Sequence, residues 1–140
     1  MLTRIDHVGI ACRSLAEKIA FYQDVFGLRL VSQEVNESQG VREAMLQVTA
    51  PAAEMSWVQL LEPLGPDTPV GRFLARRGEG IHHVGYGVPD ITAALEAIGA
   101  SGVRLLDARP RHGSMGASIA FLHPADVGGV LTELVQAAPG

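Results

Sequence analysis

The sequence predicts an α+β fold made of two repeated βαβββ modules whose mixed sheets curl into a cupped, barrel-like pocket. Two observations support this prediction. The 140-residue chain is 47% hydrophobic, which is sufficient for a packed core. The string IDHVG at residues 5–9 returns as IHHVG at residues 81–85, and similar strings follow both copies in the same order. An internal repeat of this kind indicates that one supersecondary unit occurs twice.

The first module is expected over residues 1–62. Its first strand is the apolar run at 5–12, and Ser14 with Glu17 forms a capping box that starts a helix. Gly27 is a typical helix stop. The remaining strands are expected at 27–31, 40–48 and 57–63, because these runs are rich in apolar and β-branched residues.

The second module is expected over residues 81–136, with a first strand at 81–88. Asp90 can cap the following helix, which stops near Gly102. Strands at 102–106, 116–124 and 130–136 match the three later strands of the first module. Residues 63–80 form the predicted linker, which is turn-rich and then contains a short helix. The two modules are expected to form one compact domain.

Composition excludes several classes of function. The net charge of −4 with interspersed charges argues against a nucleic-acid surface, which needs clustered cations. The single cysteine, Cys12, forms no internal disulfide and suits a reducing compartment. The N-terminal residues lack the apolar core of a signal peptide, and no apolar run is long enough to cross a bilayer. A cytoplasmic protein that does not bind membranes is therefore expected.

Strand alternation selects His7 and His83 as candidate functional residues. In a strand, alternate side chains face opposite sides of the sheet. His7 therefore shares a face with Gly9, and His83 shares a face with Gly85, so small neighbours leave space beside each ring. His82 lies on the other face. The structural alternative is that both are hydrogen-bonded histidines of the core or rim.

Three further polar residues interrupt apolar strand faces. Glu43 lies in the middle of the predicted 40–48 strand, and its repeat counterpart is Ile119. An unpaired buried carboxylate is costly, so Glu43 lies at an open rim or has a function. Gln59 and Glu133 occupy equivalent positions on the last strands of the two modules. The alternative for both is a solvent-facing position at a sheet edge.

His7, Gln59, His83 and Glu133 therefore make two repeat-related pairs that converge if the sheets curve around one cavity. Two imidazoles and two oxygen donors suit a divalent ion such as Co²⁺, Mn²⁺, Fe²⁺, Ni²⁺ or Zn²⁺. A neutral amide oxygen is a weak ligand, which argues against a closed structural zinc site. This donor set favours an octahedral centre with positions open to water or substrate.

The sequence resembles the vicinal oxygen chelate (glyoxalase-like) superfamily and, within it, the methylmalonyl-CoA epimerases. The resemblance covers essentially the whole chain. It is carried by DHVGIA, GVREAM, WVQLLEPLGPDTPVGRFL, GIHHVGYGVPDI and FLHPADVGGVLTELVQ. It implies metal ligands at His7, Gln59, His83 and Glu133, an additional base at Glu43, and one divalent ion, with Co²⁺ as the first choice.

The resemblance also implies a reaction and a substrate. A metal-dependent epimerase would remove the C2 proton of (2R)- or (2S)-methylmalonyl-CoA, and the Glu43–Glu133 pair would return a proton on the opposite face of a metal-stabilised enolate. The coenzyme A thioester is the expected partner, and a homodimer is expected by resemblance. Ser114 and Gly116 are candidate substrate contacts, because they lie in a turn that could bind the substrate carboxylate. Three arginines of the linker could contact the phosphates of coenzyme A: Arg72, Arg76 and Arg77. Their alternatives are a hairpin loop and a solvated helix face.

Other functions of the same fold stay open at this point. A glyoxalase-type isomerase acting on a glutathione adduct would use similar proton transfer, and only substrate tests separate the two. An extradiol dioxygenase prefers two histidines and one carboxylate, so Gln59 argues against it. A metal-free binding protein needs no ligand set, so four candidate ligands argue against that class.

Overall fold

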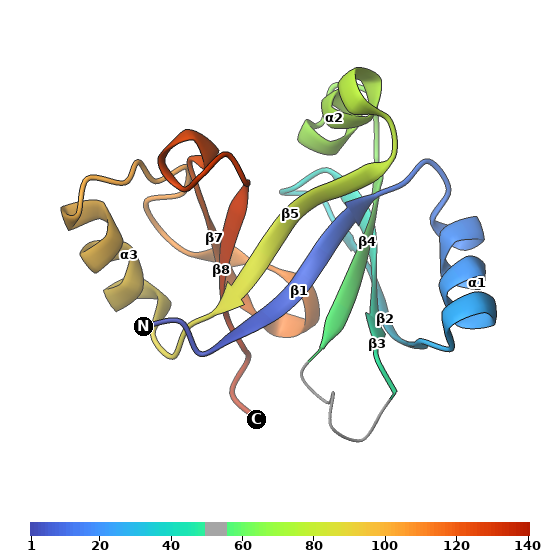
Figure 1. Cartoon of the computed structure of the whole chain (residues 1–140), viewed down its shortest axis with the longest axis horizontal. Coiled ribbons are helices and arrows are strands. Elements are labelled where there is room, and N and C mark those ends of the chain that lie inside the picture. The colour runs from blue at the N-terminus through green and yellow to red at the C-terminus, as the bar shows by residue number, and fades with distance from the viewer. Residues whose placement is uncertain (50–55) are drawn as a thin grey trace. The chain divides into compact units, whose positions relative to one another are not determined.

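The computed structural model describes residues 1–49 and 56–140. These residues form two compact units: the first unit is residues 7–82, and the second unit is residues 1–6 with 83–140. Along the chain, each repeat gives a strand, a helix and three more strands (Figure 1). No helix in the described ranges is long and apolar enough to span a membrane.

The sheet of the first unit is mixed, as predicted. β1 (Arg4–Ala11) pairs in parallel with β4 (Trp57–Pro63). β4 is antiparallel to β3 (Val41–Gln47), which is antiparallel to β2 (Arg29–Asn36), so the strand order is β2-β3-β4-β1. A parallel pair needs a long crossover connection, and here that connection includes α1, β2 and β3.

Helix α1 (Leu15–Phe26) begins and ends where the sequence predicts. The Ser14 hydroxyl accepts the backbone N–H of Glu17, and Gly27 ends the helix with φ 70°, in the left-handed region that favours glycine. The helix packs on one face of the sheet. The buried residues of this layer are Cys12, Leu15, Ile19, Ala44, Leu46 and Leu60. The opposite face of β1, β3 and β4 is the one that carries His7, Glu43 and Gln59.

Helix α2 (Pro69–Arg77) covers one end of that second face. It begins at Thr68, whose hydroxyl accepts the N–H of Gly71. Gly71 is required, because a Cβ there would lie 2.3 Å from the carbonyl oxygen of Gly65. Val70 and Leu74 belong to a buried cluster with Ala11, Val41 and Leu61, which lie on the same strands and the same face as the predicted site residues. α2 therefore bounds the polar part of this face.

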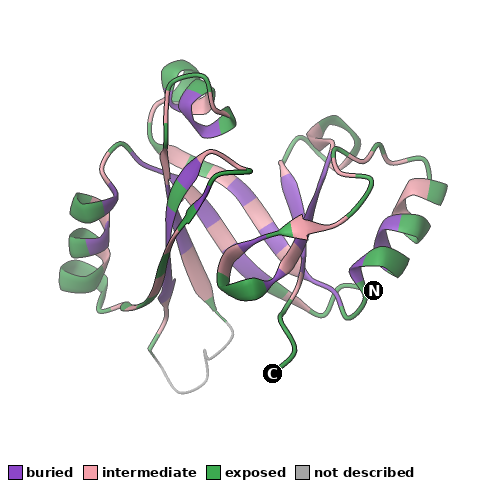
Figure 2. Cartoon of the chain, turned by 180° about the vertical axis from the view of Figure 1, so that it is seen from behind, coloured by how far each residue is buried: buried purple, intermediate pink, exposed green. Residues whose placement is uncertain are grey.

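The second unit repeats the arrangement. β5 (Gly80–Gly87) is parallel to β8 (Thr132–Gln136), β8 is antiparallel to β7 (Ser118–Leu122), and β7 pairs with the short β6 (Arg111–His112), giving the order β5-β8-β7-β6. Helix α3 (Ile91–Ala100) starts at Asp90, whose carboxylate accepts the N–H of Ala93. α3 packs on the face that carries Ala120 and Leu134. Figure 2 shows that α1 and α3 are each buried along the side that faces the strands and exposed along the other.

The predicted strand at 102–106 is wrong. In this segment Leu105 forms one isolated bridge to Leu122, and the strand that pairs with β7 is β6. Side chains hold the segment instead of a β-ladder. The backbone N–H and the guanidinium of Arg104 both donate to Asp126, and the carboxylate of Asp107 accepts the N–H of Phe121.

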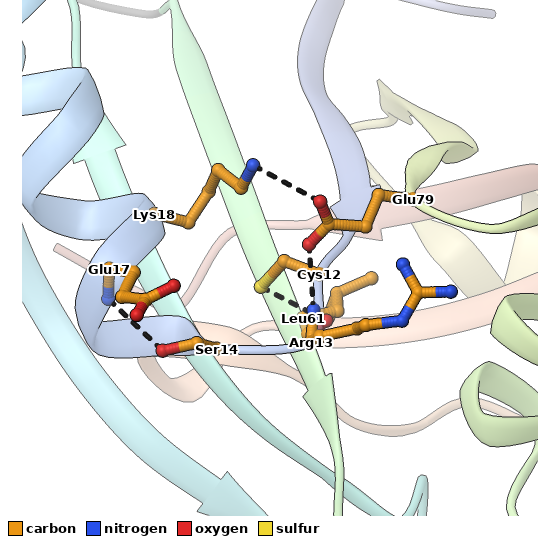
Figure 3. A network of polar contacts seen from close by, with 7 residues as sticks. All are labelled: Cys12, Arg13, Ser14, Glu17, Lys18, Leu61 and Glu79. Carbon is orange, nitrogen blue, oxygen red and sulfur yellow. Dashed lines mark hydrogen bonds and ion pairs between the residues drawn. The ribbon is translucent and has the colours of Figure 1, made fainter.

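A polar network joins the end of β1 to α1 and to the segment before β5 (Figure 3). The Cys12 thiol donates to the carbonyl of Leu61 at 3.5 Å. Glu79 accepts the backbone N–H of Arg13 at 2.9 Å and pairs with Lys18 at 3.4 Å. The N–H of Arg13, followed by the smaller effect of Lys18, lowers the pKa of Glu79. The network fixes the chain where β1 leaves the sheet.

We expect Cys12 to resist alkylation in the folded protein. Its side chain is fully buried, and burial raises the pKa of the thiol to about 11. The reactive thiolate is therefore scarce at pH 8. Mass spectrometry after iodoacetamide treatment should find the native chain unlabelled and the urea-unfolded chain fully labelled. Rapid labelling of the native chain would contradict the burial of Cys12.

We expect the Arg104–Asp126 ion pair to stabilise the fold in a pH-dependent way. The guanidinium of Arg104, and then its backbone N–H, lower the pKa of Asp126 to about 2. A depressed folded-state pKa adds stability above the unfolded-state value of about 3.9, and this stability is lost as pH falls towards 2. Asp126→Asn should therefore lower the melting temperature at pH 6 and have no effect near pH 2. Asp24→Asn, at an exposed position of α1, is the control, and an Asp126→Asn effect that is unchanged by pH would count against the pair.

Candidate functional site

His7, Glu43 and Gln59 lie on one face of the first unit. β1 and β4 pair in parallel, with Gly9 opposite Gln59. His7 lies two residues before Gly9 on β1, so its side chain is on the same face of the sheet as that of Gln59. β3 and β4 pair with Met45 opposite Gln59, which puts Glu43 on the same face as its diagonal neighbour. All three polar side chains are buried, with exposed fractions of 4%, 1% and 5%. The registers therefore bring these three polar side chains onto one face.

Glu43 and Gln59 are joined by a buried hydrogen bond. The amide Nε2 of Gln59 donates to Oε2 of Glu43 at 2.9 Å. Burying a carboxyl group without a partner is unfavourable, and this contact supplies one. Because an amide has its donor and acceptor at opposite ends of one planar group, the bond also fixes which side of Gln59 presents Oε1. Sequence reasoning missed this bond, although Glu43 and Gln59 were both predicted to face the same side.

The second unit brings His83 and Glu133 together. β5 and β8 pair in parallel with Gly85 opposite Glu133, so His83 again precedes the pair by two residues. Nε2 of His83 lies 3.8 Å from Oε2 of Glu133, and both side chains are almost completely buried. Phe121 contacts the His83 ring edge-to-face with the ring centres 5.4 Å apart.

The strand registers confirm the repeat at the level of single residues. Gln59 is opposite Gly9 in the first unit, as Glu133 is opposite Gly85 in the second. In the second unit Ile119 pairs with Val135, two residues beyond the pairing of Phe121 with Glu133. Ile119 therefore takes the place that Glu43 has in the first unit, where Glu43 pairs with Leu61. The two halves thus differ at two linked positions.

His82 has a different environment from its neighbour. Its ring packs edge-to-face on Phe73 of α2, with the ring centres 5.2 Å apart. Burial lowers the pKa of His82 to about 4, so the ring is neutral at physiological pH. The prediction that His82 belongs to the face opposite His83 agrees with this contact. His82 therefore serves packing, and it offers a matched control for changes at His83.

The five predicted substrate contacts, Ser114, Gly116, Arg72, Arg76 and Arg77, lie outside the buried pairs. Ser114 and Gly116 lie in a short 3₁₀ turn between β6 and β7, in which Met115 has φ 54°. A non-glycine residue in this left-handed region is uncommon. Arg72 and Arg76 are exposed on α2, and the guanidinium of Arg72 donates to the carbonyl of Asp67.

The buried donors are suited to a divalent metal ion. His7 in the first unit, and His83 with Glu133 in the second, offer two imidazoles and one carboxylate, which are donor types that bind such ions. Gln59 adds a neutral oxygen. Imidazole and carboxylate donors fit Co²⁺, Mn²⁺, Fe²⁺, Ni²⁺ and Zn²⁺ in chemical type, and the mixed N/O set with a neutral amide differs from the cysteine-rich sets of structural zinc. The residues present therefore fit the implied metal.

Comparison with known proteins places this arrangement in a class. Residues 6–121 match the model of the Glyoxalase/Bleomycin resistance protein/Dioxygenase superfamily. The match covers more than half of the chain and includes strands from both modules. The chain therefore belongs to this superfamily, and the predicted α+β fold with two βαβββ modules is confirmed.

Relatives of known name narrow the class. A variant of Streptomyces coelicolor methylmalonyl-CoA epimerase in complex with 2-nitronate-propionyl-CoA is 49% identical, with a TM-score of 0.94 over 99% of this chain and 100% of that chain. Methylmalonyl-CoA epimerase from Mycobacterium tuberculosis is 41% identical, with a TM-score of 0.93 over 99% and 90% of the two chains. The ethylmalonyl-CoA/methylmalonyl-CoA epimerase of Cereibacter sphaeroides is 35% identical over 97% of this chain and 99% of its own. Within the superfamily, the chain belongs to the family of methylmalonyl-CoA epimerases.

Proposed function

We propose that the chain interconverts the (2R) and (2S) forms of methylmalonyl-CoA. The observation that carries the proposal is the pair of buried carboxyl groups, one in each module, each beside a residue of metal-ligand type. Glu43 contacts Gln59, and Glu133 lies next to His83. Inversion at a carbon needs a proton acceptor on one face and a proton donor on the other. Family membership supplies the substrate class, a coenzyme A thioester.

His7, Gln59, His83 and Glu133 are the proposed ligands of one divalent ion, with Co²⁺ as the first choice. Burial of all four and their repeat-related registers support this assignment. When bound, the ion would supply positive charge to the thioester and carboxylate oxygens of the substrate, which lowers the barrier to removing the C2 proton. Because Gln59 is neutral, the site keeps more positive charge on the ion than it would with a second carboxylate at this position.

Glu43 and Glu133 are the proposed acid and base. One carboxylate accepts the C2 proton, and the other, protonated, returns a proton to the opposite face of the resulting enolate. The two groups come from different modules, which suits work on opposite faces. Glu43 is the simpler of the two, because it is not among the proposed ligands and its Oε2 is held by the Gln59 amide. Glu133 has to serve both as ligand and as proton carrier.

Outer contacts to the substrate are assigned by chemistry. The turn at Ser114 and Gly116 offers a hydroxyl and backbone N–H groups for the substrate carboxylate. Arg72 and Arg76 on α2 offer charge to the coenzyme A phosphates. α2 covers one end of the face that carries His7, Glu43 and Gln59, which supports a role for these arginines near that face. We further propose that the protein is cytoplasmic and that it forms a homodimer.

Metal binding should depend on His83 but not on His82. We expect His83→Ala to weaken Co²⁺ binding at least about 10-fold, since even indirect partners of metal ligands contribute 10- to 100-fold. His82→Ala removes a neighbouring ring that packs on Phe73 and should leave affinity unchanged. Isothermal titration of the chelator-stripped proteins measures both. Equal weakening by the two substitutions would contradict the assignment of His83.

The roles of the two glutamates should separate in matched variants. Glu43→Gln should retain one Co²⁺ per chain and lose inversion by at least about 100-fold, because general acid–base groups contribute 10²–10⁴-fold. Glu133→Gln should lose both metal and activity. Metal analysis and a coupled assay of epimerisation give the two readouts. Full inversion by Glu43→Gln would eliminate the two-base scheme.

The decisive experiment follows the C2 proton. NMR of methylmalonyl-CoA in heavy water should show exchange of the C2 proton when the protein is added, and a chelator should stop it. The hemithioacetal of glutathione and methylglyoxal, the substrate of a glyoxalase, should remain unchanged. Turnover of the glutathione adduct without C2 exchange of the thioester would replace the proposed function.

A further inference from the structure

We infer that Gln59 is a positioning residue for Glu43 as well as a ligand, and that its amide N–H orients the Glu43 carboxylate for exchange of the C2 proton. This inference rests on the proposed function. Its structural basis is the buried 2.9 Å hydrogen bond from Nε2 of Gln59 to Oε2 of Glu43. The bond fixes the position of one oxygen of the carboxylate and therefore the orientation of the whole carboxylate group.

The bond joins two rigid positions. Glu43 and Gln59 are on β3 and β4, which are the inner strands of the order β2-β3-β4-β1. Antiparallel pairing places Met45 opposite Gln59 and Glu43 opposite Leu61, so the two side chains are diagonal neighbours on one face. Both are at most 5% exposed. A contact between two buried side chains on paired strands holds a carboxylate more precisely than a loop could.

The amide group has the chemistry that both roles require. Its Nε2 is a donor and its Oε1 an acceptor, so one planar group can donate to Glu43 and present an oxygen to a cation. A glutamate at 59 would offer acceptors only, and two carboxylates would then be in contact inside the protein. The amide therefore lets a base and a ligand be direct neighbours.

The repeat provides an internal comparison. In the second unit the position of Gln59 is held by Glu133, and the position of Glu43 is held by the apolar Ile119. A carboxylate is thus present at the ligand position where its diagonal neighbour is apolar, and an amide is present where the neighbour is a carboxylate. Each module has one carboxyl group in this pair of positions. An amide at position 59 beside a carboxylate at position 43 is what we expect if the Gln59 N–H is there to bind Glu43.

The first test measures the hydrogen bond without metal. Gln59→Glu should lower the melting temperature of the chelator-stripped protein, because two carboxylates meet. Adding Glu43→Gln to this variant exchanges donor and acceptor and should recover most of the loss. Gln33→Glu, on the exposed side of β2, is the control for a new surface charge. A double variant that is no more stable than Gln59→Glu would overturn the inference.

The second test measures positioning through the chemistry. Exchange of the C2 proton is followed separately for the (2R) and (2S) thioesters at saturating Co²⁺, with metal content checked in each sample. Glu43→Gln identifies the enantiomer whose proton Glu43 removes. Gln59→Met keeps the size of the side chain and deletes the N–H donor, and it should slow exchange of that same enantiomer about 10- to 100-fold more than the other, as expected for a misplaced base.

The outcomes separate the two claims. A role of Gln59 as ligand alone predicts equal slowing of both enantiomers, and this result would overturn the positioning role while leaving the epimerase intact. Selective slowing of the enantiomer that Glu43→Gln leaves unaffected would overturn it as well. Gln33→Met, a matched change on the exposed side of β2, should alter neither rate. Absence of exchange in the unmodified protein would overturn the proposed function, and the melting temperatures would still report on the hydrogen bond.

Discussion

The parallel pairing between the first and last strand of each module determines where the candidate histidine and oxygen ligands lie. It puts Gln59 beside Gly9 and Glu133 beside Gly85, so that each oxygen donor shares a face with the histidine two residues earlier. Side chains alternate along a strand, and a register shift of one residue would turn the donor to the opposite face. A single backbone constraint, used twice, therefore places one histidine and one oxygen donor on the same face in each unit.

The helices make this constraint stable by separating two kinds of packing. α1 and α3 cover the faces that carry apolar residues such as Leu60 and Leu134, and these faces supply the hydrophobic free energy of each unit. The polar face can then hold groups that are costly to bury, provided they contact each other. Glu43 with Gln59 and Glu133 with His83 meet this condition. α2 adds an apolar cluster at one end of the first face, so the buried polar region is bounded by hydrophobic packing.

The sequence was sufficient for much of this, because the signals are periodic and repeated. Capping at Ser14 and Asp90, the strand faces and the Glu43–Ile119 equivalence all follow from local pattern and internal comparison. The strand predicted at 102–106 failed for a physical reason: Arg104 and Asp107 bind distant partners, Asp126 and Phe121, and no local pattern encodes such contacts. The Gln59–Glu43 bond was missed likewise, since a face assignment gives direction but not distance. The roles assigned to these residues in binding metal and substrate stay predictions.

Duplication alone would give two identical halves, and inversion of a carbon centre needs two groups that differ in protonation at any moment. The chain departs from identity at the linked positions 43 and 59, where Glu43 and Gln59 stand against Ile119 and Glu133. One carboxyl group is thereby held by an amide and the other by an imidazole, so the two have unlike surroundings within equivalent backbones. The proposed proton carriers, Glu43 and Glu133, therefore occupy different positions of the repeat, and the Gln59 amide beside Glu43 differs chemically from the His83 imidazole beside Glu133.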